Sequence, residues 1–120
     1  MELLVVDCEV RPEAVVVSAK GELDSNTAEQ FAAQLDAGLR QAATHAGRLV
    51  ILDLDGLRYF GSAGLNAVLD CHRSGVEAGT TVRVVAANPV VVTPIQVTKL
   101  DEVLALYRSL PDALQGISDP

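Results

Sequence analysis

Val50-Ile-Leu-Asp-Leu-Asp-Gly-Leu-Arg-Tyr-Phe-Gly-Ser-Ala-Gly-Leu65 is the stretch that indicates most about how this chain folds. Residues 50–54 are apolar except for Asp53, as expected of a strand that is covered on both faces. Gly56 marks the point where this strand is expected to give way to a loop over residues 55–62. Apolar residues then recur at helical spacing and predict an amphipathic helix over residues 62–77 with one buried stripe. The stripe comprises Leu65, Val68, Leu69, His72 and Val76.

Ser62 stands where this helix begins. Serine is among the preferred N-cap residues, because its side-chain oxygen accepts a hydrogen bond from backbone N–H groups that lack partners in the first turn. We therefore expect Ser62 to cap the helix. The same position also tolerates an anion, since free N–H groups and the positive end of the helix dipole would meet a phosphoryl group on the serine.

The other elements follow from apolar patterning and turn residues. Strands are predicted at residues 3–10, 14–19, 81–87 and 104–107, and the first two are expected to be antiparallel. A helix follows the capping candidates Asp24, Ser25 and Asn26, and the pair Asn26 and Glu29 resembles a capping box. Residues 90–98 are assigned to a helix, because a proline at position 94 would interrupt a central strand. A last helical turn is expected at 112–117.

The predicted order of elements is β-β-α-β-α-β-α-β-α. Because helices join the later strands, this order predicts an α/β fold with a mixed, mostly parallel sheet and helices packed against it. Residues 1–120 are expected to form a single domain with a frayed tail at 118–120.

Composition and charge limit the kind of core and the classes of function that this chain can have. The 120 residues are 49% hydrophobic but only 3% aromatic, which predicts a core of Val, Leu, Ile and Ala. The formal net charge of -7 argues against binding to nucleic acid or to an acidic membrane, because both depend on Lys and Arg. The sequence shows no basic leader and no run long enough to span a membrane, so we expect a cytoplasmic protein.

The two cysteines, Cys8 and Cys71, are far apart and have no second Cys or His at ligand spacing. We expect both to be buried free thiols, and we expect neither a metal site nor a cofactor.

Two local motifs on these elements resemble the STAS domain, in particular the single-domain anti-sigma factor antagonists of bacteria. The first is Gly21-Glu-Leu-Asp24, followed by Thr27-Ala-Glu29 at the start of the first helix. The second is Leu52-Asp-Leu54, then Leu57 and Phe60, then Ser62-Ala-Gly-Leu65 at the start of the central helix. The likeness extends from the first strand to Leu114.

This resemblance implies a partner-switching role. The serine that matches Ser62 is phosphorylated in such proteins by a serine kinase of the histidine-kinase-like ATPase group, which is also the anti-sigma factor. The unphosphorylated antagonist binds that kinase and releases a sigma factor, and a serine phosphatase resets the phosphorylated form. No catalytic activity is expected of the antagonist itself.

The contact face implied for this chain comprises the exit loop at residues 21–24, the 55–62 loop and the exposed side of the central helix. Its candidate partner-binding residues are Asp24, Ser25, Asn26, Asp55, Tyr59, Gly61, Ser62, Ala63 and Asn66. Substitution of Asp24 or Asn66 is expected to weaken the complex with little effect on stability. The family commonly has Asp directly before the serine, and this chain has Gly61 there.

Two alternatives stay open. A STAS-type scaffold could bind a partner through the same face without being phosphorylated, which the glycine at position 61 would suit. Residues 50–57 also look like the first motif of haloacid-dehalogenase phosphatases, in which Asp53 would be the nucleophile and Asp55 an acid/base beside magnesium. Leu57 stands where that motif usually has Thr, and no later acidic pair completes a magnesium site.

Overall fold

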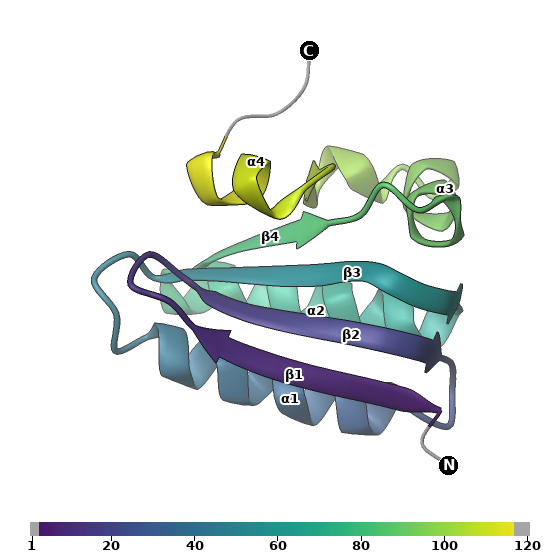
Figure 1. Cartoon of the computed structure of the whole chain (residues 1–120), viewed down its shortest axis with the longest axis horizontal. Coiled ribbons are helices and arrows are strands. Elements are labelled where there is room, and N and C mark those ends of the chain that lie inside the picture. The colour runs from purple at the N-terminus through teal and green to yellow at the C-terminus, as the bar shows by residue number, and fades with distance from the viewer. Residues whose placement is uncertain (1–2, 117–120) are drawn as a thin grey trace.

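The computed structural model describes residues 3–116, which form one five-stranded sheet with helices on both faces (Figure 1). The strands are β1 (Leu4–Val10), β2 (Val15–Leu23), β3 (Leu49–Phe60), β4 (Thr81–Val85) and β5 (Ala105–Tyr107), in that spatial order. Strand β1 is antiparallel to β2, and the other neighbours are parallel. The helices are α1 (Ala28–Ala42), α2 (Ser62–Ala78), α3 (Pro89–Val97) and α4 (Leu110–Gln115), with a short 3-10 helix at Leu100–Glu102. The predicted mixed α/β fold is confirmed.

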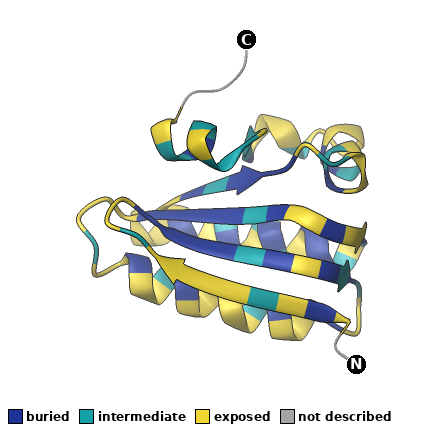
Figure 2. Ribbon diagram, viewed as in Figure 1, coloured by how far each residue is buried: buried dark blue, intermediate teal, exposed yellow. Residues whose placement is uncertain are grey.

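The main core lies between the sheet and helices α1, α2 and α3. Alternate residues of a strand point to opposite faces, so one set of β2 side chains packs against these helices while the other set faces away. Figure 2 shows the result: β2 and β3 are buried along most of their length, whereas β1 is largely exposed. Representative core residues are Phe31, Leu35, Leu52, Val68 and Ile95.

Helix α4 covers part of the opposite face. Its Ala113 is buried in a second, smaller cluster with Val16, Ile51 and Val85. The helix starts at Leu110, earlier than the predicted turn at 112–117, because the Ser109 hydroxyl caps it by accepting from the Asp112 N–H at 3.3 Å. Residue 117 and the tail at 118–120 lie outside the described residues. The rest of this face, over β1 and β2, is left open.

The predicted ends of the two central strands are wrong. Strand β2 continues to Leu23 rather than leaving the sheet at residue 21, and β3 continues to Phe60 rather than ending at Gly56. The two strands stay paired as far as Leu23 and Phe60, with register shifts on the way. The buried side chain of Phe60 stabilises this extension. Gly56 permits it, because any other residue would place a Cβ only 2.8 Å from Cγ of Lys20 on the neighbouring strand.

The buried stripe of α2 is also displaced from the predicted one. Leu65 and Val68 are buried as expected, but Val76 is 67% exposed, and Cys71 and Gly75 take part in the buried face instead. Cys71 is therefore the buried thiol that was expected, whereas Cys8 is exposed because β1 is an edge strand. No helix within residues 3–116 is long and apolar enough to cross a membrane.

Candidate functional site

The first turns of α1 and α2 lie side by side at one end of the sheet (Figure 1). Their preceding strands are parallel neighbours, and Leu23 pairs with Phe60 where both strands finish. Immediately afterwards the Gly61 N–H donates to the Leu23 carbonyl oxygen at 3.0 Å. The turn after β2 and the start of α2 are therefore held together, as expected for two parallel strands that end at the same edge.

Ser62 is the first residue of α2 and does not cap it. The N-cap is Gly61, which is extended at φ −91° and ψ 179°, and whose carbonyl oxygen accepts from the Leu65 N–H at 3.0 Å. A cap residue must be non-helical, and Ser62 is already helical because β3 runs on to Phe60. The expectation that Ser62 caps the helix is wrong.

The hydroxyl of Ser62 is exposed and makes no hydrogen bond with any residue between 3 and 116. The backbone N–H groups of Ser62, Ala63 and Gly64 likewise have no acceptor within the described part of the chain. Unpaired N–H groups at a helix start favour a negatively charged group beside them. Ser62 therefore offers a free hydroxyl at a place where an added anion is tolerated.

The turn before α1 is built in the opposite way. The Oδ1 atom of Asp24 accepts from the N–H groups of Asn26 at 2.9 Å and Thr27 at 3.2 Å. The buried Thr27 hydroxyl donates to the Glu22 carbonyl oxygen at 2.9 Å and accepts from the Asp24 N–H at 3.0 Å. These bonds give Asp24 a structural role, so a change there is expected to cost stability.

The predicted capping box is absent. The N-cap of α1 is Thr27, and no side-chain bond links Asn26 with Glu29 among the described residues. Ser25 and Asn26 are both exposed, so they remain available for contact. Thr27 is part of the first sequence motif, but the hydrogen bonds of its hydroxyl were not predicted. The position of Thr27 directly before the apolar pattern of the helix was the signal that could have indicated them.

Asp55 is engaged elsewhere in the fold. Its Oδ1 atom accepts from the N–H groups of Ala87 at 2.8 Å and Asn88 at 2.9 Å. The Asn88 side chain in turn donates to the Leu57 carbonyl oxygen at 2.8 Å and caps α3 by accepting from the Val90 N–H. Asp55 thus links β3 to the start of α3. Its proposal as a partner-binding residue did not predict this structural role.

The remaining candidates form one surface around Ser62, which we call the Ser62 face: Tyr59, Gly61, Ser62, Ala63 and Asn66. Tyr59 is 52% exposed and Asn66 is exposed, while Gly61 and Ala63 are half-buried. Ala63 and Asn66 also line a groove of about 390 Å³ between α1 and α2. The residues of both helices that line it include three alanines and three carboxylates: Ala28, Ala32, Ala67, Glu29, Asp36 and Asp70.

Burial governs the chemistry of the one thiol in this groove. Cys71 is only 4% exposed, and burial, with a smaller contribution from the charge of Asp36, raises its pKa to about 12. A thiol with a raised pKa is a poor nucleophile at neutral pH, because the thiolate is the reactive form. Cys71 is therefore a packing residue.

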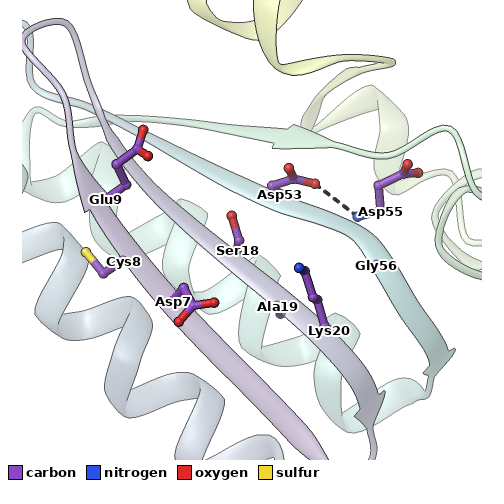
Figure 3. A pocket seen from close by; sticks show the side chains of 9 residues that line it. All are labelled: Asp7, Cys8, Glu9, Ser18, Ala19, Lys20, Asp53, Asp55 and Gly56. Carbon is purple, nitrogen blue, oxygen red and sulfur yellow. Dashed lines mark hydrogen bonds between the residues drawn. The ribbon is translucent and has the colours of Figure 1, made fainter.

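A second hollow, of about 650 Å³, lies on the open face of the sheet and contains Asp53 and Asp55 (Figure 3). Lys20 and Ser18 from β2 and acidic side chains from β1 complete its lining. The arrangement gives the phosphatase alternative no support. The Oδ1 atom of Asp55 already accepts hydrogen bonds from two backbone N–H groups. Within residues 3–116, no group of three His, Cys, Asp or Glu side chains is placed to hold a metal ion.

Comparisons with known proteins agree with this architecture. The chain is 29% identical over 102 residues to the anti-sigma-F factor antagonist RsfB of Mycobacterium tuberculosis, covering 85% of this chain and 80% of the relative. An anti-sigma factor antagonist from Mycobacterium paratuberculosis matches in structure with a TM-score of 0.85 and 28% identity, over 97% of this chain and 95% of the other. The Bacillus cell fate determinant SpoIIAA in its phosphorylated form has the same fold, with a TM-score of 0.68, 22% identity and coverage of 94% and 99%.

The sequence match to the family itself spans residues 5–113, which includes the whole sheet except the start of β1, as well as the Ser62 face. The protein belongs to the STAS domain family.

Proposed function

We propose that this protein is an anti-sigma factor antagonist whose binding is switched off by phosphorylation of Ser62. In its unphosphorylated form it binds an anti-sigma factor through the Ser62 face and so releases a sigma factor. The partner is a serine kinase of the histidine-kinase-like ATPase group, and a serine phosphatase restores the binding form. This role would place the protein in the cytoplasm.

The observation that carries the proposal is the free Ser62 hydroxyl at the bare start of α2. A phosphoacceptor must reach the γ-phosphorus of ATP, and Ser62 is exposed and has no hydrogen bond to another residue of the described range 3–116 that would have to be broken. In the transfer, Ser62 Oγ forms a bond to the γ-phosphorus while the bond from that phosphorus to the β,γ-bridging oxygen breaks. ADP leaves, and the hydroxyl proton passes to a base of the kinase or to solvent.

The relatives support the same role. RsfB and the Mycobacterium paratuberculosis protein are named as anti-sigma factor antagonists, and both are covered over most of their length. A SpoIIAA structure of the phosphorylated form has this fold, so the fold is compatible with a phosphoryl group.

Charge explains how one phosphoryl group could act as a switch. Phosphorylation adds about −1.5 to −2 charges at neutral pH. Within the protein, an anion at a helix N-terminus contributes about 0.3–1 kcal/mol of stability. At an interface, like-charge contact costs several kcal/mol, which is the larger effect. We therefore expect the fold to persist and the complex to dissociate.

The groove between α1 and α2 suits a basic partner surface. Glu29, Asp36 and Asp70 border it without an opposing Lys or Arg inside the groove, and Asp70 is paired only weakly with Arg73 at 4.0 Å. Because complementary charge steers association, we expect the anti-sigma factor to present Lys and Arg here.

The test uses purified protein and each histidine-kinase-like ATPase encoded by the source organism. Calorimetric titration measures binding with ADP and magnesium, and intact-mass spectrometry after ATP addition measures transfer of one phosphoryl group. We expect one ATPase to bind wild type, to phosphorylate it and to lose affinity for Ser62→Asp by at least about 100-fold, which corresponds to several kcal/mol at the interface.

Thr44→Asp is the matched control. Thr44 is exposed and follows the C-terminal end of α1, whereas Ser62 lies beside the start of that helix, and Thr44 lines neither the Ser62 face nor the groove between α1 and α2. It receives the same charge and should bind nearly as wild type does. Equal binding of wild type and Ser62→Asp would contradict the switch and favour the non-phosphorylated STAS scaffold.

A further inference from the structure

Tyr59 is unusual among the aromatic residues of this chain. The sequence contains two Tyr and two Phe. Phe31 and Phe60 are buried, and Tyr107 is half-buried with the Arg83 guanidinium 5.8 Å from its ring centroid. Tyr59 alone of the four is more than half exposed, at 52%. A large aromatic side chain in water at the edge of a candidate interface calls for a physical explanation.

The strand itself explains why Tyr59 points outward. Leu57 and Phe60 are buried, and the two residues between them, Arg58 and Tyr59, are exposed. Tyr59 is paired with Glu22 of β2, directly before the pair that ends both strands. The buried Phe60 fixes the backbone on one side, so Tyr59 is presented from a rigid strand rather than from a loose loop.

Gly61 explains the direction in which the Tyr59 ring lies. A Cβ built on Gly61 would be 3.0 Å from Cε1, 3.1 Å from Oη and 3.4 Å from Cζ of Tyr59. The hydroxyl end of the ring therefore lies over the place where a side chain at position 61 would begin. Gly61 has φ −91° and ψ 179°, which any residue can adopt, so the backbone does not require glycine here. The nearest atoms to that Cβ position all belong to the Tyr59 ring, so a side chain at position 61 would push the ring from its place.

We propose that Tyr59 is the anchor residue of the Ser62 face and that Gly61, by lacking a side chain, leaves room for its ring in the binding orientation. The inference rests on the proposed function for the identity of the partner, an anti-sigma factor. That partner would offer a pocket with apolar walls for the ring and a hydrogen-bonding group at its end for the phenol. Tyrosine is enriched among residues that dominate binding, and a ring already placed loses little freedom on binding.

The decisive test is a double-mutant cycle on the complex with the anti-sigma factor, using Tyr59→Ala, Gly61→Val and both together. Tyr59→Ala should weaken binding by about 30-fold or more, the level that defines a dominant contact. Gly61→Val should weaken it as well, because its side chain displaces the ring. In the Tyr59→Ala background, Gly61→Val should cost a clearly smaller fold-change in affinity than it does in the wild-type background, since there is no ring left to displace.

Two controls make the readout specific. Tyr59→Phe keeps the ring and should lose only the part due to the hydroxyl, about 5-fold to 10-fold. Val76→Ala removes an exposed apolar side chain near the far end of α2 and should have an effect below about 3-fold. Melting temperatures establish that each variant is folded.

The possible outcomes separate this proposal from the phosphorylation switch. Additive effects of Tyr59→Ala and Gly61→Val, or a Tyr59→Ala effect no larger than that of Val76→Ala, would overturn the anchor even if Ser62→Asp abolishes binding. Strong coupling between the two sites together with unchanged binding of Ser62→Asp would support the anchor and reject the switch. Wild-type protein that binds no anti-sigma factor of its organism would overturn both.

Discussion

Helices α1 and α2 begin side by side at the same end of the sheet, yet their first turns differ in one respect. The turn before α1 is closed by side chains: the Asp24 carboxylate and the Thr27 hydroxyl satisfy backbone groups on either side. Within residues 3–116 the start of α2 has no such bond, and the Ser62 hydroxyl has no hydrogen-bond partner there. One start is stabilised by its own residues, whereas the other keeps unpaired N–H groups available to an anion.

The contrast indicates how the fold can carry a switch without being destabilised by it. The hydrogen bonds of the turn before α1 and the burial of Phe60 hold the carboxyl ends of β2 and β3 in place. The open α2 start can then change its charge without losing a bond that the fold needs. Five measurements test this difference between the two helix starts.

The largest expected effect comes from the packing that both starts share. A Cβ on Gly64, in the first turn of α2, would lie 2.5 Å from Cγ and 2.7 Å from Cδ2 of Leu23. Gly64→Val should therefore lower the free energy of unfolding by about 3 kcal/mol or more, since the core cannot accept the added volume. Urea denaturation measures the loss, with Ser74→Val on the exposed face as control. A loss below about 1 kcal/mol would contradict the packing role.

Thr27→Val tests the closed turn directly. The substitution keeps the shape of a buried side chain but removes the hydroxyl that bonds Glu22 and Asp24, so we expect about 2 kcal/mol of destabilisation. Thr44→Val removes an exposed hydroxyl with one local bond and should change the unfolding free energy by less than about 0.5 kcal/mol. Equal effects at the two threonines would remove the contrast between closed and open turns.

Cys71 reports on the packing of α2 against α1. Burial raises its pKa from 9.0 to about 12, so between these values the unfolded chain loses the thiol proton while the folded chain keeps it. Stability must then fall as pH rises above 9, with a slope of at most about 1.4 kcal/mol per pH unit. Chemical denaturation of wild type and Cys71→Ala across this range isolates the effect. Parallel curves would show that the thiol ionises equally in both states.

Asp24→Ala should cost about 1 kcal/mol, because it removes the acceptor for two N–H groups of the turn. Asn66→Ala, on the exposed side of α2, should stay within about 0.5 kcal/mol of wild type. Thermal unfolding distinguishes the two. This prediction replaces the expectation that neither substitution affects stability. An unchanged melting temperature for Asp24→Ala would restore that expectation.

The smallest effect is expected at Ser62 itself. Ser62→Ala removes a hydroxyl without a hydrogen bond, so the unfolding free energy should change by less than about 0.5 kcal/mol. Phosphorylated protein should be equal to or slightly more stable than wild type, by about 0.3–1 kcal/mol. Calorimetry on both forms checks these values. A clear loss of stability in either form would mean that Ser62 has a structural bond after all.

Local patterns predicted the elements well where a single physical rule applied. The strand predicted at 81–87 is present as β4 (Thr81–Val85), and the helix predicted at 90–98 is present as α3, with the Asn88 side chain as its cap and Pro89 in its first turn. Proline at the first turn and a polar cap before it act within one turn of chain, so nearby residues suffice to indicate them.

Predictions were wrong where contacts with residues distant in the sequence determine the local structure. Gly56 looked like the end of a strand, but Leu57 and Phe60 extend β3 because the end of β2 offers them a partner. Val76 fits the predicted helical stripe by spacing, yet the buried face of α2 runs through Val68, Cys71 and Gly75 and leaves Val76 67% exposed. Asp55 was expected to lie in a loop, whereas it belongs to β3 and its carboxylate accepts from the N–H groups of Ala87 and Asn88, which follow β4.

Sequence patterns were enough to predict the order of elements, the aliphatic core and the place of Ser62 at the start of a helix, because these depend on periodicity and on residue types close in the chain. Two features of the site depend on the folded chain: Gly61, not Ser62, is the cap, and the Tyr59 ring lies over it. Both follow from how far β3 pairs with β2, which is a contact between segments more than thirty residues apart. Local propensity carries no information about such pairing, because its free energy comes from burial against the partner strand.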